Sequence, residues 1–222
     1  MIRVVVFDFD GTLVDSNSVK ETCMKAVVAG IDGGQQALVA AVARGGNRYR
    51  VFAGVARALD PKGAPEAVAA HGRQLAATYT ACCARGIVAA RERRGGRQML
   101  ATLRRRGLRL WIASATPWRD LRPILRRRGL PPLLDGALGG PASKIGNLRR
   151  IMRAERAMPG EVILIGDGHD DLAAARSLGI WFVALTAGNR LPGPHRFAMR
   201  DLTSLVALVD RLRTRPRWRG RA

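Results

Sequence analysis

Two carboxylates, Asp8 and Asp10, lie one residue apart behind the apolar run VVVF in the stretch VVVFDFDGTLVDS (residues 4–16). Like charges this close resist joint ionisation unless a cation or a proton relieves them. A second acidic cluster, GDGHDD (residues 166–171), follows the apolar run VILI. Both apolar runs have the pattern of parallel strands, whose carboxyl ends form the ligand-binding edge of an α/β sheet. We therefore expect the two clusters to meet at one site.

The chemistry of this cluster points to a hard divalent cation. The two stretches hold six of the chain's 17 Asp and Glu residues, in a protein with 38 Lys and Arg and a formal net charge of +21. Mg²⁺ is usually bound through one or two carboxylates and keeps positions for water and phosphate. We therefore expect Mg²⁺ as the cofactor.

Strand and helix patterns alternate through most of the chain. Short apolar runs without period-two alternation, typical of parallel strands buried on both faces, occupy residues 2–7, 108–113, 162–165 and 180–185, with a weaker run at 133–138. Helical patterns occupy residues 97–106, 118–128, 144–156, 170–178 and 202–212. The alternation predicts an α/β fold with a doubly wound parallel sheet.

Residues 17–92 interrupt this alternation. They contain only Ala-rich helical patterns, at residues 18–29, 35–44, 47–59 and 65–85. Ser18 with Glu21 three positions later predicts a capping box at the start of the first of these helices. We therefore expect an α/β core domain made of residues 1–16 and 93–222, and an inserted helical domain made of residues 17–92.

Four motifs in this order resemble those of the haloacid dehalogenase superfamily. They are DFDGTLVDS, Ser114 after LRLWIA, Lys144 in PASKIGNL, and GDGHDDLAAA. The helical insertion resembles the cap of the phosphoglycolate-phosphatase-like members. The resemblance implies a Rossmann-like core with a helical cap, and a Mg²⁺-dependent phosphatase that hydrolyses a small phosphate monoester through an aspartyl phosphate. A sugar-phosphate mutase with the same core is the alternative within the superfamily.

The resemblance also implies roles for residues of the first two motifs. Asp8 corresponds to the nucleophile that attacks phosphorus. Asp10 corresponds to the acid/base that protonates the leaving oxygen and then takes a proton from water. Ser114 and the backbone N–H of Ala115 would bind the phosphoryl oxygens; Thr116 is a rival to Ser114 for this role.

In the other two motifs, Lys144 would place positive charge beside the phosphoryl group and Asp8. Asp167 would bind Mg²⁺ directly, whereas Asp171 would hold a metal-bound water or orient Lys144. Asp170 competes with Asp171, but a four-residue spacing puts Asp171 on the same helical face as Asp167. His169 is expected to be a solvated loop residue. The expected metal-binding set is Asp8, Asp10, Asp167 and Asp171.

In the insertion, the stretch ARGGNRYRVF (residues 43–52) is the expected substrate-recognition segment. Paired glycines before a basic helix start allow a backbone to approach an anion. Arg48 could bind a second anionic group of the substrate bidentately; a solvated helix residue is the alternative. Asn17 and Lys20 are further candidates.

The strongly basic composition leaves two interpretations. Only four of the 38 basic residues are Lys, so the Arg bias reflects either a GC-rich genome or a positive field that attracts anions. We expect no stable nucleic-acid partner, although the Arg-rich end at residues 211–222 leaves weak binding possible, and a nucleic-acid-binding or regulatory protein on the same fold is the alternative from another functional class. The expected ligand partner is a small phosphorylated metabolite.

The remaining features indicate a cytoplasmic protein that does not enter a membrane. Cys23, Cys82 and Cys83 are odd in number and two are adjacent, a poor disulfide framework. No apolar stretch approaches the length of a membrane span, and no signal sequence is evident. Either a monomer or a homodimer is compatible with these features.

Overall fold

The structure, a computed structural model, describes residues 1–186 and 196–214. The chain forms two compact units, one made of Met1–Asp15 with the described residues from Arg91 onward, and the other made of Ser16–Ala90. Among the helices in these described ranges, none combines the length and apolar character needed to cross a membrane. The predicted Arg-rich end of the chain lies outside the described residues from position 215 onward.

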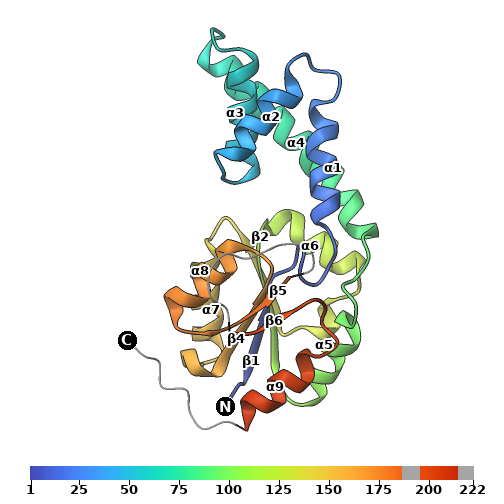
Figure 1. Ribbon diagram of the computed structural model, residues 1–222, viewed down its shortest axis with the longest axis vertical. Helices are drawn as coiled ribbons and strands as arrows, with labels where there is room; N and C mark the ends of the chain where they lie inside the picture. The colour runs from blue at the N-terminus through green and yellow to red at the C-terminus, as the bar shows by residue number, and fades with distance from the viewer. Residues whose placement is uncertain (187–195, 215–222) are drawn as a thin grey trace. The chain divides into compact units, whose positions relative to one another are not determined.

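A six-stranded sheet of parallel pairs runs through the first unit in the order β3-β2-β1-β4-β5-β6 (Figure 1). The strands are β1 (Val4–Phe7), β2 (Arg109–Pro117), β3 (Gly136–Gly140), β4 (Val162–Gly166), β5 (Trp181–Leu185) and β6 (Ala198–Met199). The strand order reverses direction at β1, because the chain builds the β2 side first and then returns to the β4 side. Ligands of doubly wound sheets bind at such a switch point.

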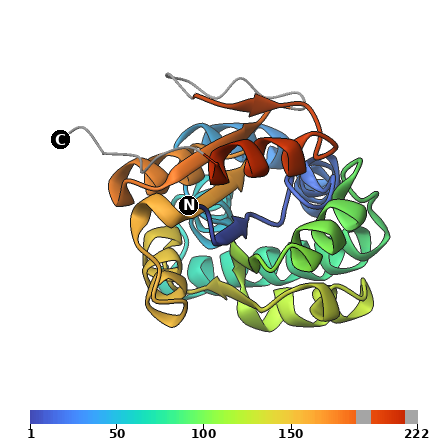
Figure 2. The ribbon, with the colours of Figure 1, turned by 90° about the horizontal axis from the view of Figure 1, so that it is seen from below.

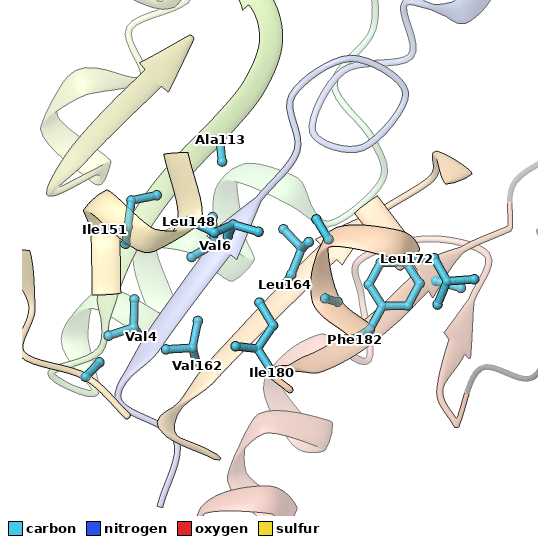
Figure 3. Packing of buried hydrophobic residues seen from close by; sticks show 14 residues of the cluster. Val4, Val6, Ala113, Leu148, Ile151, Val162, Leu164, Leu172, Ile180 and Phe182 are labelled. Atoms are coloured by element: carbon cyan, nitrogen blue, oxygen red, sulfur yellow. The ribbon is translucent and has the colours of Figure 1, made fainter. Parts of the chain in front are cut away.

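Helices cover both faces of this sheet (Figure 2). They are α5 (Gly96–Arg105), α6 (Trp118–Arg127), α7 (Lys144–Ala154), α8 (His169–Leu178) and α9 (Leu205–Arg213). On one face, Val6 and Leu164 of the sheet belong to the same buried cluster as Leu148 of α7 and Leu172 of α8 (Figure 3). Burial of β1 and β4 on both faces explains their continuous apolar runs. The predicted doubly wound α/β fold is confirmed.

The second unit is the helical insertion between β1 and β2, as predicted. Its helices are α1 (Asn17–Val28), α2 (Gly34–Ala43), α3 (Arg48–Leu59) and α4 (Pro65–Ala89). Helices α3 and α4 approach closely at Gly72, where a Cβ atom would lie 3.0 Å from the Cα of Ala53. The rings of Phe52 and Tyr79 pack between the same two helices with centroids 5.5 Å apart.

The interpretation of the cysteines is wrong. Cys23 of α1 and Cys82 of α4 form a disulfide, and Cys83 is a buried thiol. The two partners are 59 residues apart in the sequence, so their spacing carries no signal of pairing. Disulfides are typical of oxidising compartments, and the cysteines therefore give no support to the cytoplasmic expectation.

Three further local predictions differ from the structure. The weak strand expected at residues 133–138 is β3, Gly136–Gly140, and a 3-10 turn at Pro131–Leu133 precedes it, because proline lacks the N–H that a strand ladder needs. The two-residue strand β6 was not predicted, since two residues are too short for a periodic pattern. The predicted capping box is also wrong: α1 begins at Asn17, and the N-cap is Ser16, whose side chain does not cap the helix.

Candidate active site

The site begins where β1 ends. The N–H of Asp8 donates to the carbonyl of Ile165 at 2.8 Å, which holds Asp8 beside the end of β4. The chain then turns at Gly11, whose φ of 80° lies in the left-handed region that glycine adopts without steric cost. The N–H of Gly11 closes this turn by donating to the carbonyl of Val14 at 2.8 Å.

The two acidic loops meet at this edge of the sheet, as the strand pattern predicted. Oxygen atoms of Asp8, Asp167 and Asp171 lie within 4.8 Å of one another. Asp171 is 3% exposed, and it approaches β4 so closely that a Cβ atom at Gly166 would lie 2.4 Å from its Cγ. Glycine at the end of β4 therefore makes room for this carboxylate.

Lys144, at the start of α7, joins the cluster as its only ammonium group among the described residues. Its Nζ lies 2.5 Å from Asp8 Oδ1 and 2.7 Å from Asp171 Oδ1, and it also donates to the carbonyl of Ala113 at 2.6 Å. Burial alone would lower the pKa of Lys144, but the two carboxylates outweigh it and raise that pKa. The ammonium therefore stays charged between Asp8 and Asp171.

The carboxylates respond in the opposite sense to burial. Burial raises the pKa of Asp8 to about 7, although the charge of Lys144 opposes the shift. Burial likewise raises the pKa of Asp171, against the charge of Lys144 and the hydrogen bond from the Gly168 N–H. A single ammonium thus does not fully stabilise the negative charge gathered here. An all-oxygen set with excess negative charge fits a hard divalent cation, and the chemistry of these donors therefore suits Mg²⁺.

Asp10 differs from the other carboxylates of the site. It is 7% exposed, and its Oδ2 accepts a hydrogen bond of 2.7 Å from the hydroxyl of Thr116. It does not belong to the group of three carboxylates within 4.8 Å of one another. Its side chain is held from the β2 side of the switch point instead.

Ser114 lies near the carboxyl end of β2 with 1% of its surface exposed. Its Oγ accepts a hydrogen bond of 3.0 Å from the N–H of Thr116, an interaction that does not use the hydroxyl proton of Ser114. Ala115, the next residue, is exposed. This end of β2 lies beside Asp8, since Lys144 joins Asp8 to the carbonyl of the neighbouring Ala113. The Ser114 hydroxyl and the Ala115 N–H are the donors that it could offer to a ligand.

The other predicted residues lie away from the carboxylate cluster or in the second unit. Asp170 and His169 are exposed in the first turn of α8. Arg48, in the second unit, donates to Thr80 Oγ1 at 2.6 Å, and its guanidinium lies 5.8 Å from the Tyr79 ring centroid. Asn17 is exposed and Lys20 half-buried at the start of α1 in that unit.

The sequence analysis assigned no role to two residues that hold the acidic loops. Thr12 is buried, and its hydroxyl donates to Asp167 Oδ1 at 3.1 Å. Arg93 donates to the carbonyl of Gly11 at 2.7 Å and to Asp15 Oδ1 at 3.3 Å. Thr12 lies inside the first acidic motif, which is a usable signal, whereas nothing in the sequence around Arg93 relates it to Gly11.

Comparisons with known sequences indicate one family. The profile of the haloacid dehalogenase-like hydrolases matches residues 2–179. A phosphoglycolate phosphatase of Synechococcus elongatus is 34% identical over 96 residues, which make up 42% of this chain and only 45% of that relative. A phosphoglycolate phosphatase of Pseudomonas syringae pv. syringae is 26% identical over 193 residues, 84% of this chain and 70% of that relative.

Solved structures share the fold. A predicted phosphoglycolate phosphatase from Haemophilus somnus 129pt superposes with a TM-score of 0.75 and 18% identity, over 94% of this chain and 98% of that chain. The Bacillus subtilis HAD-hydrolase YfnB, solved bound to magnesium, superposes with a TM-score of 0.70 and 16% identity, over 94% of this chain and 99% of that chain. At these identities the likeness concerns the fold alone.

Proposed function

Because the chain belongs to the haloacid dehalogenase-like hydrolases, we propose that it is a Mg²⁺-dependent phosphatase that hydrolyses a small phosphate monoester through an aspartyl phosphate. One observation carries the proposal: Lys144 lies between Asp8 and Asp171 in a cluster of three carboxylates at the switch point of the sheet. This arrangement presents a carboxylate nucleophile beside a fixed positive charge.

Asp8, Asp167 and Asp171 are the residues that would hold Mg²⁺, which when bound supplies positive charge to the phosphoryl oxygens. The sequence analysis also placed Asp10 in this set. Its hydrogen bond with Thr116 and its place outside the three-carboxylate group favour the acid/base role for its side chain. The magnesium bound to YfnB supports the same cofactor for this chain.

Two balanced steps follow from these roles. In the first, an oxygen of Asp8 forms a bond to phosphorus while the bond from phosphorus to the ester oxygen breaks, and Asp10 gives its proton to that departing oxygen. In the second, a water oxygen bonds to phosphorus, one water proton passes to Asp10, and the bond between Asp8 and phosphorus breaks. The products are an alcohol and inorganic phosphate.

Positive charge and N–H and O–H donors stabilise the charge on the transferring group. Lys144 lies against Asp8 and offsets the repulsion between that carboxylate and the phosphoryl oxygens. The hydroxyl of Ser114 and the N–H of Ala115 would donate to the same oxygens. These donors are fixed before the substrate arrives because Ser114 is already hydrogen-bonded to Thr116.

The helical insertion would act as the cap that excludes bulk water during the reaction. Arg48 would contribute to recognition of a second anionic group, although its guanidinium already donates to Thr80. The phosphoglycolate phosphatases among the relatives support a small substrate of this kind, with a carboxylate next to the phosphate ester. Phosphoglycolate is therefore the first substrate to test.

The experiment compares wild-type protein with Asp8→Asn across phosphoglycolate, sugar phosphates and nucleoside monophosphates, with Mg²⁺ and with EDTA. We expect Mg²⁺-dependent release of phosphate by the wild type and none by Asp8→Asn. Asp170→Asn is the matched control, because it removes an exposed carboxylate from the same acidic motif. If Asp8→Asn turned over substrate at nearly the wild-type rate, Asp8 would not be the nucleophile, and the proposed mechanism would be wrong.

A further inference from the structure

The carboxyl group of Asp10 is held by a side chain from another strand. Thr116 lies near the carboxyl end of β2, and its hydroxyl donates to Asp10 Oδ2 at 2.7 Å. The two residues are 106 positions apart in the sequence. Asp10 is buried, so this hydrogen bond forms with little competition from water. It therefore restricts rotation of the Asp10 carboxyl group.

Thr116 is itself fixed on two sides. Its N–H donates to Oγ of Ser114, two residues earlier in β2, at 3.0 Å. Strand β3 packs directly against its carbonyl, since a Cβ atom at Gly139 would lie 2.5 Å from the Thr116 oxygen. The pairing of β2 with β3 shifts register between Ala113 and Pro117, so the part of β2 that holds Thr116 departs from the regular ladder.

A buried amide anchors this contact to the helix that carries Lys144. The side-chain Nδ2 of Asn147 donates to the carbonyl of Gly139 at 3.2 Å, and Asn147 is fully buried. Asn147 lies in the first turn of α7, three residues after Lys144. Strand β3, which packs against the Thr116 carbonyl, is thus hydrogen-bonded to the same helix that carries the ammonium of the site.

We propose that Thr116 is a positioning residue that aims the proton of Asp10 at the leaving group, an inference that rests on the proposed phosphatase function. The Thr116 hydroxyl holds Oδ2, so the proton passes from Oδ1 to the ester oxygen as the bond from phosphorus to that oxygen breaks and its electron pair moves onto the oxygen. The role differs from the phosphoryl-binding role for which Thr116 rivals Ser114.

The test varies how much the leaving group needs a proton. 4-Nitrophenolate departs readily without protonation, whereas phenolate is more basic and depends on a general acid. Because general acids contribute roughly 10²–10⁴-fold, we expect Thr116→Val to lower kcat/KM about tenfold for phenyl phosphate and less than about twofold for 4-nitrophenyl phosphate. Thr116→Ser restores a hydroxyl and should return the ratio of the two esters toward the wild-type value.

Thr12→Val is the matched control. It also removes a threonine hydroxyl that donates to a carboxylate of the site, but the acceptor is Asp167 rather than Asp10. We expect Thr12→Val to lower the turnover of both esters by the same factor and to weaken Mg²⁺ binding measured by calorimetry. Thr116→Val should leave that Mg²⁺ affinity unchanged. Circular dichroism of each variant establishes that it is folded.

The outcomes distinguish failure of the positioning role of Thr116 from failure of the proposed phosphatase function. An equal loss for the two esters in Thr116→Val, or no loss for either, would overturn the positioning role while the phosphatase stands. If Asp8→Asn retained the wild-type turnover of both esters, or if the wild type released phosphate neither from these esters nor from the metabolites of the first experiment, the proposed function itself would fail and the role of Thr116 with it. A phosphoryl-binding role for Thr116 would appear as equal losses.

Discussion

Lys144 is the residue on which the electrostatics of the site depend most. Its side chain is 8% exposed and pairs with two buried carboxylates. Lys144→Met should abolish catalysis and lower the free energy of unfolding by about 3–5 kcal/mol, because it leaves buried carboxylates without their countercharge. Urea unfolding in EDTA, followed by circular dichroism, measures the change.

A surface lysine provides the control for that prediction. Lys25 pairs with Glu21 one helical turn away, but both side chains are largely exposed, at 62% and 69%. Lys25→Met should leave the urea midpoint almost unchanged because water screens such a pair. Equal midpoint shifts in Lys144→Met and Lys25→Met would contradict the electrostatic role assigned to the buried pair.

Among the strands and helices, the end of β4 limits the position of Asp171, because this carboxylate packs directly against Gly166. Gly166→Ala would place a Cβ atom 2.4 Å from Asp171 Cγ, so either the strand or the start of α8 must shift. We expect a loss of about 1–3 kcal/mol in stability, typical of overpacking, together with a large loss of turnover because Asp171 and Lys144 separate. Thermal unfolding and phosphate release report the two effects.

Gly96→Ala is the matched substitution at the start of α5. A Cβ atom there would meet Leu202 Cδ1 at 3.6 Å, an ordinary van der Waals contact. Alanine also favours a helix over glycine. We therefore expect unchanged turnover and unchanged or slightly higher thermal stability. If Gly166→Ala had the same turnover and thermal stability as Gly96→Ala, the close approach of β4 to Asp171 would not be needed for activity.

At the scale of the whole molecule, the net charge of +21 contrasts with the carboxylate cluster. The proposed Mg²⁺ would bind the folded cluster and not the unfolded chain. At a concentration 100-fold above its dissociation constant it should therefore stabilise the fold by about 2.7 kcal/mol and raise the unfolding temperature. Differential scanning calorimetry in EDTA and in a Mg²⁺ series measures this shift.

Salt must be controlled in that experiment, because ions also screen the self-repulsion of a basic protein. NaCl at matched ionic strength should give a smaller increase in unfolding temperature, shared by the wild type and Asp167→Asn. Only the wild type should show the additional increase with Mg²⁺. An identical Mg²⁺ response in Asp167→Asn would show that screening, rather than the acidic cluster, accounts for the stabilisation.

The parallel α/β core, the helical insertion and the convergence of the acidic loops could all be predicted from the amino-acid sequence. These features follow from local patterns: apolar runs mark buried strands, and carboxylates that follow neighbouring parallel strands share one edge. Asp8, Asp167 and Asp171 could therefore be placed together before any coordinates were known. Within the motif that the resemblance identifies, helical spacing favours Asp171 over Asp170, and the structure places Asp171 in the cluster and Asp170 at the surface.

The contacts that orient these groups could not be predicted from the sequence and depend on the folded chain. The hydrogen bonds from Thr116 to Asp10 and from Thr12 to Asp167 join residues 106 and 155 positions apart, and the Cys23–Cys82 disulfide joins α1 to α4. Such contacts depend on strand order, register and side-chain rotamers rather than on neighbours along the chain. A local sequence pattern predicts whether a side chain is buried or exposed. Which atoms that side chain contacts depends on how the helices and strands pack.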